Sequence, residues 1–223
     1  KPSSAASVVY NRQEFGESVH KAIQKILDGK AKVSDYKEDE LKAIKNAMAS
    51  LKILEKTYPG FKFKKSEQYV KVAMSDMTKY TKKDGFYFSG FIDVIFKHND
   101  GIILVDWKTN RSKGSNESVY KRQLAVYKKM ISKQYKIPED KITICLIWLA
   151  LRGGVNTGRF DTEIVIGHGS GVYKTFEKHL QTILAWRSKP NEFLKELVQE
   201  PDDEENQPLQ GIIKDKLTSI GIK

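Results

Sequence analysis

The segment GFIDVIFKHNDGIILVDWK, residues 90–108, is typical of a β-hairpin. Two runs rich in apolar and β-branched residues flank His98-Asn99-Asp100-Gly101, and Asn, Asp and Gly tolerate the positive φ angles that tight turns require. With a two-residue loop at Asn99-Asp100, Asp93 is expected to lie directly opposite Asp106.

The two faces of this hairpin differ in polarity. Side chains alternate along a strand, so Asp93, Asp106 and Lys108 are expected to share one face. Shifting the loop by one residue changes the partners but keeps these three groups together. The other face is expected to be an unbroken apolar surface that packs on a core. Its cross-strand pairs are Ile92 with Trp107, Val94 with Val105, and Phe96 with Ile103.

Two neighbouring carboxylates repel each other, and a buried unpaired charge is costly, so Asp93 and Asp106 require a cation. A hard divalent ion with oxygen ligands fits, and Mg²⁺ is the default in phosphate chemistry. The alternative is a pair of solvated strand-end residues with Lys108 as their salt-bridge partner. The apolar run before Asp106 and the second acid on a paired strand favour the metal site.

The rest of the chain alternates between helical and strand periodicities. Helices are expected at 12–29, 38–57, 116–135 and 172–187, and further strands at 62–74, 142–150 and 159–166. This order predicts an α/β fold with a mixed central sheet flanked by helices. We expect one domain over residues 1–190, with a helical elaboration at 1–57, an α/β core at 62–187, and a partly mobile tail at 191–223.

The composition indicates a nucleic-acid partner. The 223 residues include 39 Lys and Arg against 28 Asp and Glu, a net charge of +11. Such a surplus points to a polyanion, although a lysine-rich surface can also serve solubility alone. No apolar segment reaches the ~18 residues of a membrane span, so no membrane partner is expected. Protein partners and oligomeric state are not indicated.

The single cysteine, Cys145, lies in an apolar run and is expected to be buried. One cysteine cannot form a disulfide framework, a zinc site or a cysteine-bound iron–sulfur cluster. The localisation is unknown from the sequence, with an intracellular, reducing compartment as the expectation. Because the chain begins at Lys1 rather than Met, we expect a trimmed or mature fragment.

Four short motifs occur in a specific order. They are Gly16-Glu17-Ser18-Val19-His20, Gly90-Phe91-Ile92-Asp93, Asp106-Trp107-Lys108-Thr109 and Gln123-Leu124-Ala125-Val126-Tyr127. The set resembles the G-x-x-x-H, G-x-x-D, D-x-K-T and Q-x-x-x-Y elements of the PD-(D/E)xK nuclease superfamily. The closest likeness is to its RecB-like branch, which includes the Cas4 proteins and the mitochondrial genome maintenance exonuclease. Each motif is weak alone, but the ordered set is specific.

This resemblance implies a restriction-endonuclease-like core and metal-dependent phosphodiester hydrolysis. The catalytic residues it implies are Asp93, Asp106, Lys108, Gln123 and the strand acid Glu67. The ligands it implies for one or two Mg²⁺ or Mn²⁺ ions are His20, Asp93, Asp106 and the main-chain carbonyl of Trp107. With only Cys145, the iron–sulfur cluster of Cas4 is excluded. No G-x-x-x-x-G-K-[ST] phosphate loop occurs, so no nucleotide cofactor is expected.

Basic and aromatic residues around the strand at 62–74 are candidates for nucleic-acid binding. The lysines are Lys62, Lys64, Lys65, Lys79, Lys82 and Lys83, and the aromatic residues available for base stacking are Tyr69, Tyr80, Phe86 and Tyr87. Arg111 and Tyr127 are added because they lie near the implied site. The alternative for each lysine is a solvated basic face, and Tyr127 could equally pack behind the site.

The expected function is a DNA exonuclease that prefers single-stranded ends and acts in replication, repair or recombination. The preference is inferred from the resemblance, because relatives thread strands beneath a helical arch that residues 1–57 could form. Two alternatives remain open. One is a catalytically inactive nucleic-acid-binding module, and the other is a viral RNA endonuclease of the same superfamily.

Overall fold

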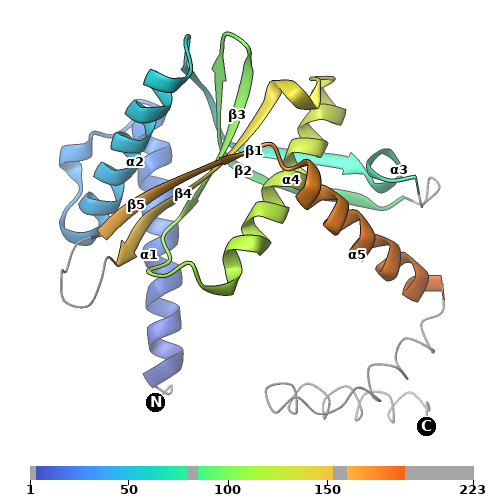
Figure 1. Ribbon diagram of the computed structural model, residues 1–223. Helices are drawn as coiled ribbons and strands as arrows, with labels where there is room; N and C mark the ends of the chain where they lie inside the picture. Colours follow the sequence, from blue (N-terminus) through green and yellow to red (C-terminus); the bar gives the residue numbers. More distant parts are fainter. Residues whose placement is uncertain (1–3, 80–84, 153–159, 189–223) are drawn as a thin grey trace. The chain divides into compact units, whose positions relative to one another are not determined.

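The computed structural model describes residues 4–79, 85–152 and 160–188, and its centre is a five-stranded sheet of order β1-β2-β3-β4-β5 (Figure 1). The strands are β1 (Lys62–Ala73), β2 (Tyr87–His98), β3 (Gly101–Lys108), β4 (Ile142–Arg152) and β5 (Phe160–Gly167). The β3–β4 pair is parallel and the other three pairs are antiparallel. The mixed sheet is therefore confirmed.

Helices flank this sheet, as an α/β fold requires. They are α1 (Ser4–Leu27), α2 (Glu38–Thr57), α3 (Met74–Met77) and α4 (Glu117–Tyr135). The chain continues after β5 as α5 (Ser170–Ser188). The helix α4 connects β3 to β4, because parallel neighbours need a long crossover connection. The bounds follow the sequence closely, except that α1 begins at Ser4 rather than residue 12. The four-residue α3 was not predicted, since one turn shows no periodicity.

The central hairpin has the predicted register, with Val94 opposite Val105, Phe96 opposite Ile103 and His98 opposite Gly101. One part of the prediction is wrong. The β2–β3 pairs end at Val94, while β3 continues to pair with β4 as far as Lys108. Ile92 is therefore not paired with Trp107, and Asp93 is not a strand partner of Asp106. We call the point where β2 leaves β3 the fork.

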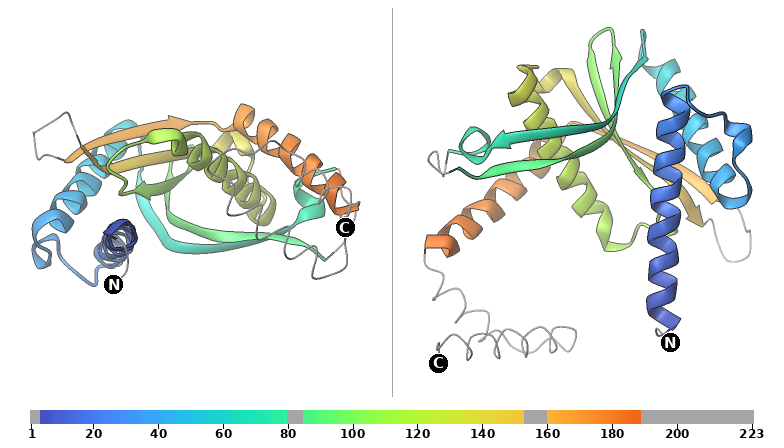
Figure 2. Two further views of the ribbon diagram at one scale, coloured as in Figure 1. Left: turned by 90° about the horizontal axis from the view of Figure 1, so that it is seen from below. Right: turned by 180° about the vertical axis from the view of Figure 1, so that it is seen from behind.

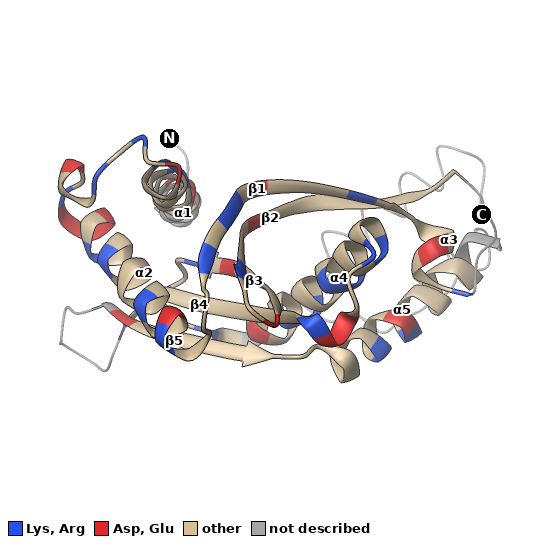
Figure 3. Ribbon diagram, turned by 90° about the horizontal axis from the view of Figure 1, so that it is seen from above, with Lys and Arg blue, Asp and Glu red and all other residues tan. Residues whose placement is uncertain are grey.

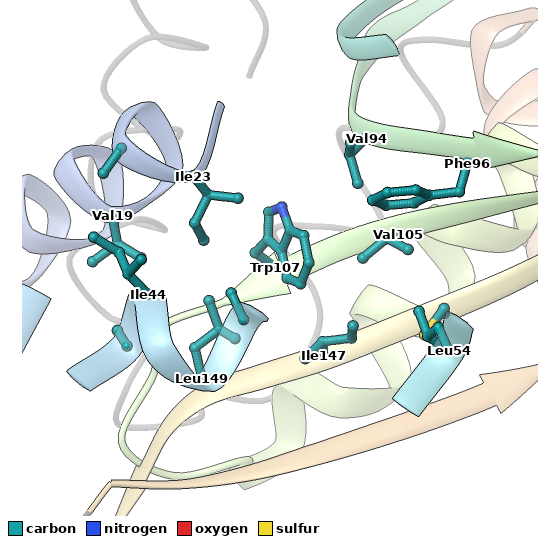
Figure 4. Packing of buried hydrophobic residues seen from close by; sticks show 14 of the residues in the cluster. Val19, Ile23, Ile44, Leu54, Val94, Phe96, Val105, Trp107, Ile147 and Leu149 are labelled. Atoms are coloured by element: carbon teal, nitrogen blue, oxygen red, sulfur yellow. The ribbon is translucent and has the colours of Figure 1, made fainter. Parts of the chain in front are cut away.

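The apolar face of the hairpin is not continuous, because its residues divide between two separate cores. Trp107 packs with Val19 and Ile23 of α1 and with Val94 in the core between the sheet and helices α1 and α2 (Figure 4). Ile92 belongs to the second core, which contains residues of α4. Burial of this apolar surface is the main force that holds the helices on the sheet.

Beyond the fork, β1 and β2 continue as a two-stranded ribbon that curves around α4 (Figures 2 and 3). We call this ribbon the arm; it pairs residues 68–73 with residues 87–92. A register shift between Phe63 and Lys65 and a positive φ of 46° at Glu67 precede it. Such irregularities bend a strand and re-aim its side chains.

The chain divides into two compact units, residues 1–176 and 177–223. The sheet, the fork and the arm belong to the first unit. The single domain ending at residue 190 stays a prediction. Within the described residues, no helix has the length and apolar character that crossing a membrane requires.

Candidate active site

The fork brings the first carboxylate of the predicted site to the end of β3. Asp93 Oδ2 accepts a hydrogen bond from the backbone N–H of Trp107, at 2.8 Å. This N–H lies just beyond the last β2–β3 pair, so the side chain takes the place of a strand partner. Because a buried backbone donor needs an acceptor, this contact fixes the orientation of the Asp93 carboxylate.

The second carboxylate, Asp106, is 5% exposed and lies on β3. Lys108 Nζ forms an ion pair with Asp106 Oδ2 at 2.7 Å, and the same ammonium lies 4.3 Å from the centre of the Tyr120 ring. The geometry is that of a charge contact, since Oδ2 accepts no well-directed hydrogen bond in the described residues. The site thus holds its own counter-ion, and one buried oxygen lacks a hydrogen-bond donor.

His20 reaches the carboxylates from α1. Val19 and Ile23, on either side of it in sequence, are fully buried and hold α1 against the core. His20 Nδ1 lies 3.5 Å from Asp93 Oδ2. One turn earlier, a Cβ added to Gly16 would come within 2.9 Å of Thr109 Oγ1. The glycine of the motif Gly16-Glu17-Ser18-Val19-His20 therefore lets α1 cross close to the end of β3.

Burial controls the protonation of these groups. Burial raises the pKa of Asp93 to about 6, against the N–H of Trp107 and the Lys108 charge, which lower it. Burial and the neighbouring Asp93 charge raise the pKa of Asp106 to about 7, and the Lys108 ammonium opposes this rise. Burial lowers the pKa of His20. Two carboxylates that resist ionisation beside a neutral imidazole form an environment that favours an added cation.

An open cleft of about 420 Å³ leads from the surface to His20 and Asp93, whereas Asp106 and Lys108 are not among its lining residues. Its lining residues come from α1, β1 and β2: Gly16, Glu17, His20, Lys21, Gln24, Glu67 and Asp93. Glu67 is exposed, and its charge raises the pKa of both His20 and Asp93. Its positive φ is uncommon for a residue other than glycine, and such outliers concentrate at functional sites.

A family model described as the PD-(D/E)XK nuclease superfamily matches residues 6–211. The match spans most of the chain, including the fork and all four motifs. The chain belongs to the PD-(D/E)XK nuclease superfamily. No curated protein sequence matches it. The finer resemblance to the RecB-like branch stays a prediction.

The second pair of superfamily motifs meets behind the arm. A Cβ added to Gly90 on β2 would come within 2.5 Å of Tyr127 Oη on α4. Gln123 Nε2 donates a hydrogen bond to the same hydroxyl, at 3.2 Å. The glycine of G-x-x-D and the tyrosine of Q-x-x-x-Y are therefore packed against each other. These contacts position α4 against the arm close to the fork.

Replacing Gly90 by alanine is expected to lower the free energy of unfolding by about 1–3 kcal/mol, the usual cost of overpacking. The added methyl group would overlap the Tyr127 ring, and Tyr127→Ala in the same chain should recover part of the loss. Thermal denaturation of the single and double variants measures this coupling. The control is Gly171→Ala, because no atom lies within 4 Å of a Cβ placed there. Equal effects of the two glycine substitutions would contradict the packing role.

Several residues predicted to contact nucleic acid do not line the cleft beside the carboxylates. Lys64 and Lys65 are exposed on β1, where the register shift occurs. Arg111 forms an ion pair with Asp39 of α2, at 3.7 Å. Lys82 and Lys83, like Tyr80, lie outside the described residues. The nucleic-acid role of all these residues stays a prediction.

The sequence also contained site residues that were not predicted. Glu17, Lys21 and Gln24 line the cleft together with His20. Residues spaced by three or four positions share one face of a helix, so the periodicity around His20 could have indicated them. Tyr120, one turn before Gln123, was not predicted as a site residue, and its ring contacts the Lys108 ammonium.

Superfamily nucleases typically use divalent metal ions such as Mg²⁺. In the described part of this chain, no three His, Cys, Asp or Glu side chains form a ready-made ligand set. The donors near the fork nevertheless fit such an ion, because they combine carboxylate oxygens with an imidazole nitrogen. The buried Asp106 Oδ2 lies 2.7 Å from the Lys108 ammonium, so an added cation would compete with that lysine for this oxygen.

Proposed function

We propose that this chain is a divalent-metal-dependent nuclease that hydrolyses DNA from single-stranded ends. The observation that carries the proposal is the convergence of Asp93, Asp106, Lys108 and His20 at the fork, where His20 and Asp93 also line an open cleft. Buried carboxylates with raised pKa values beside a lysine have no structural need, since an apolar pair would pack there at lower cost.

The residues that would hold the metal are His20, Asp93, Asp106 and the main-chain carbonyl of Trp107. A divalent ion bound there supplies positive charge against the negative charge that develops on the scissile phosphate. The hydrogen bond from Trp107 to Asp93 holds one carboxylate in place before any ligand arrives. Burial restricts the second carboxylate, that of Asp106, and the Lys108 ammonium would have to share its Oδ2 with the ion.

Lys108 is the group of this chain best placed to contact the phosphate. Its side chain is 15% exposed, and the Tyr120 ring and Asp106 hold the ammonium at the fork. Its N–H donors can bind a phosphate oxygen or orient the attacking water. Glu67, exposed in the cleft, is proposed to accept a proton from that water. Gln123, held by Tyr127, completes the polar surface toward the substrate.

The test uses end-labelled single-stranded, double-stranded and circular DNA, and an RNA of the same sequence, with Mn²⁺, Mg²⁺ or EDTA. Metal-dependent loss of linear single strands with circles left intact is the expected result. Cleavage of circles would instead identify an endonuclease. Preference for the RNA would favour the ribonuclease alternative, and DNA binding without any cleavage would favour the inactive module.

Replacing His20 by alanine is expected to weaken Mn²⁺ binding about tenfold or more, in the range seen when groups around a metal are removed. The imidazole supplies the only nitrogen ligand in the proposed set, and Mg²⁺ prefers oxygen ligands more strongly than Mn²⁺ does, so the loss should be larger for Mn²⁺ than for Mg²⁺. Isothermal titration of metal into each protein measures it. His179→Ala, on the exposed side of α5, is the control. An unchanged Mn²⁺ titration would remove His20 from the ligand set.

A further inference from the structure

The outer face of the arm, which is turned away from α4, carries an unusual set of side chains. The cross-strand pairs on this face are Tyr69 with Phe91, Lys71 with Ser89, and Ala73 with Tyr87. The alternate residues Val70, Val72 and Ile92 are buried in the core that contains α4. Strand alternation therefore places aromatic side chains on a face that does not contribute to this core.

These rings remain open to solvent. Tyr69 is 45% exposed, Tyr87 is 53% exposed and Phe91 is 56% exposed. The Tyr69 and Phe91 rings lie 5.1 Å apart and are tilted relative to each other, so they form one continuous aromatic surface. Large exposed apolar groups that gather in one place usually mark an interaction site.

The same face carries a basic side chain, and further lysines lie along β1. The Lys71 ammonium lies 4.2 Å above the centre of the Tyr87 ring, which holds a cation among the aromatic groups. Lys64 and Lys65 are exposed at the end of β1 nearer the fork, and Figure 3 shows basic segments at both places along β1. Aromatic rings interleaved with cations match the two chemical parts of a single nucleic-acid strand, its bases and its phosphates.

This surface leads into the active-site cleft. Following the strand alternation from Phe91 and Tyr69 toward the fork, the next residues are Asp93 and Glu67, and both line the cleft. Two residues of a strand span about 6.7 Å, so the aromatic pair lies one such step from the site carboxylates. Helix α1, which forms the other wall of the cleft, lies beside the same face (Figure 2).

We propose that the outer face of the arm binds the single-stranded DNA that enters the active site. Bases stack on the Tyr69–Phe91 pair and on Tyr87, and Lys71 contacts the phosphate backbone. The inference rests on the proposed nuclease function and adds the path of the substrate strand. A docked protein is the less suitable occupant, because protein interfaces are depleted in lysine whereas this surface has Lys71 among its rings.

The test measures binding of a fluorescently labelled oligothymidine by anisotropy in EDTA, where cleavage cannot interfere. Tyr69→Ala and Phe91→Ala are each expected to raise the Kd about tenfold, within the range for loss of one stacked base. Lys71→Ala should weaken binding and make it less sensitive to salt. The control is Tyr135→Ala, since Tyr135 is an aromatic residue of similar exposure at the end of α4.

A conservative variant provides a second readout. Phe91→Trp should bind the oligonucleotide as tightly as the wild type, and stacking of a base on the new indole should quench its fluorescence. Thermal denaturation of every variant shows whether the fold is retained. If an alanine variant does not fold, Phe91→Trp still decides the proposal, because absence of quenching on binding would overturn it.

Failure of this proposal is distinguishable from failure of the proposed function. Unchanged Kd values for the Tyr69 and Phe91 variants overturn the surface even if the protein cleaves DNA. A wild-type protein that does not bind the oligonucleotide also overturns it. If the alanine variants bind normally but change the oligomeric state in sedimentation, the face binds protein instead. Binding that depends on these rings in a protein without cleavage supports the surface and rejects the nuclease.

Discussion

Replacing Asp106 by asparagine is expected to reduce DNA cleavage by about 10³-fold or more and to make the metal-free protein more stable at pH 8. The loss of cleavage follows because the substitution removes a proposed metal ligand and a negative charge from the fork. The gain in stability follows because the wild-type carboxylate is nearly fully buried, at 5% exposure. The Asp106→Asn substitution is thus expected to change activity and stability in opposite directions.

The sign of the stability change depends on the raised pKa of Asp106, about 7 in the folded protein against an ordinary value of 3.8. Between these two values the folded state binds more protons than the unfolded state, so the free energy of unfolding falls as pH rises. Each unit of pKa corresponds to about 1.4 kcal/mol, so the effect above pH 7 is on the order of a few kcal/mol. His20, whose pKa is lowered, acts in the opposite direction below pH 6.5.

Thermal denaturation in EDTA from pH 5 to pH 8 measures this effect. The wild type should lose stability across the range, whereas Asp106→Asn should lose much less. Added Mg²⁺ should raise the Tm of the wild type at pH 8 and leave that of the variant nearly unchanged. The control is Asp161→Asn, because Asp161 is exposed on β5. Wild-type turnover by the Asp106 variant would reject the site assignment.

Replacing Lys108 by methionine is expected to reduce cleavage by about 10²–10³-fold while metal binding becomes tighter. Lys108 forms an ion pair with the Asp106 oxygen that a cation would use, so the ammonium and the metal compete for it. Methionine keeps an unbranched apolar side chain beside Tyr120 and removes the charge. The two readouts should therefore change in opposite directions, which a merely structural lysine would not produce.

Single-turnover cleavage and Mg²⁺ titration of the same protein preparation give the two values. Lys113→Met is the matched control, because Lys113 also forms ion pairs with acids, but its partners Glu117 and Glu163 are not proposed site residues. Weaker metal binding by the Lys108 variant would show that the lysine helps to build the ligand set. Unchanged cleavage would remove Lys108 from the proposed chemistry.

The hairpin could be predicted in detail because its information is local. The loop residues and the alternation of polarity specify the register, and the structure has the predicted pairs from Val94 to His98. The fork could not be predicted in this way. The β2–β3 pairing ends at Val94 because α4 packs inside the curved arm and because β1 is irregular at Glu67. Both causes act over long sequence separations, which cross-strand rules do not include.

The candidate site shows the same division. Asp93, Asp106 and Lys108 were predicted from one hairpin, and the structure brings them together, although Asp93 meets β3 through its side chain instead of a strand pair. His20 was expected only through the family resemblance, since its neighbours in sequence indicate a core helix. Phe91 and Lys71 were not singled out, because alternation alone does not tell which face of a ribbon stays exposed.

The fork also separates two kinds of change that the protein can undergo. The strand β3 stays in the sheet and carries Asp106 and Lys108, whereas the arm joins the site only where Asp93 and Glu67 lie. The outer part of the arm can therefore be lengthened, shortened or given new side chains while the carboxylates keep their positions. With the proposed strand path along the arm, substrate preference and chemistry would be independently variable traits, and a different ribbon grafted beyond Phe91 would change the polymer that is bound while the proposed reaction centre stays unchanged.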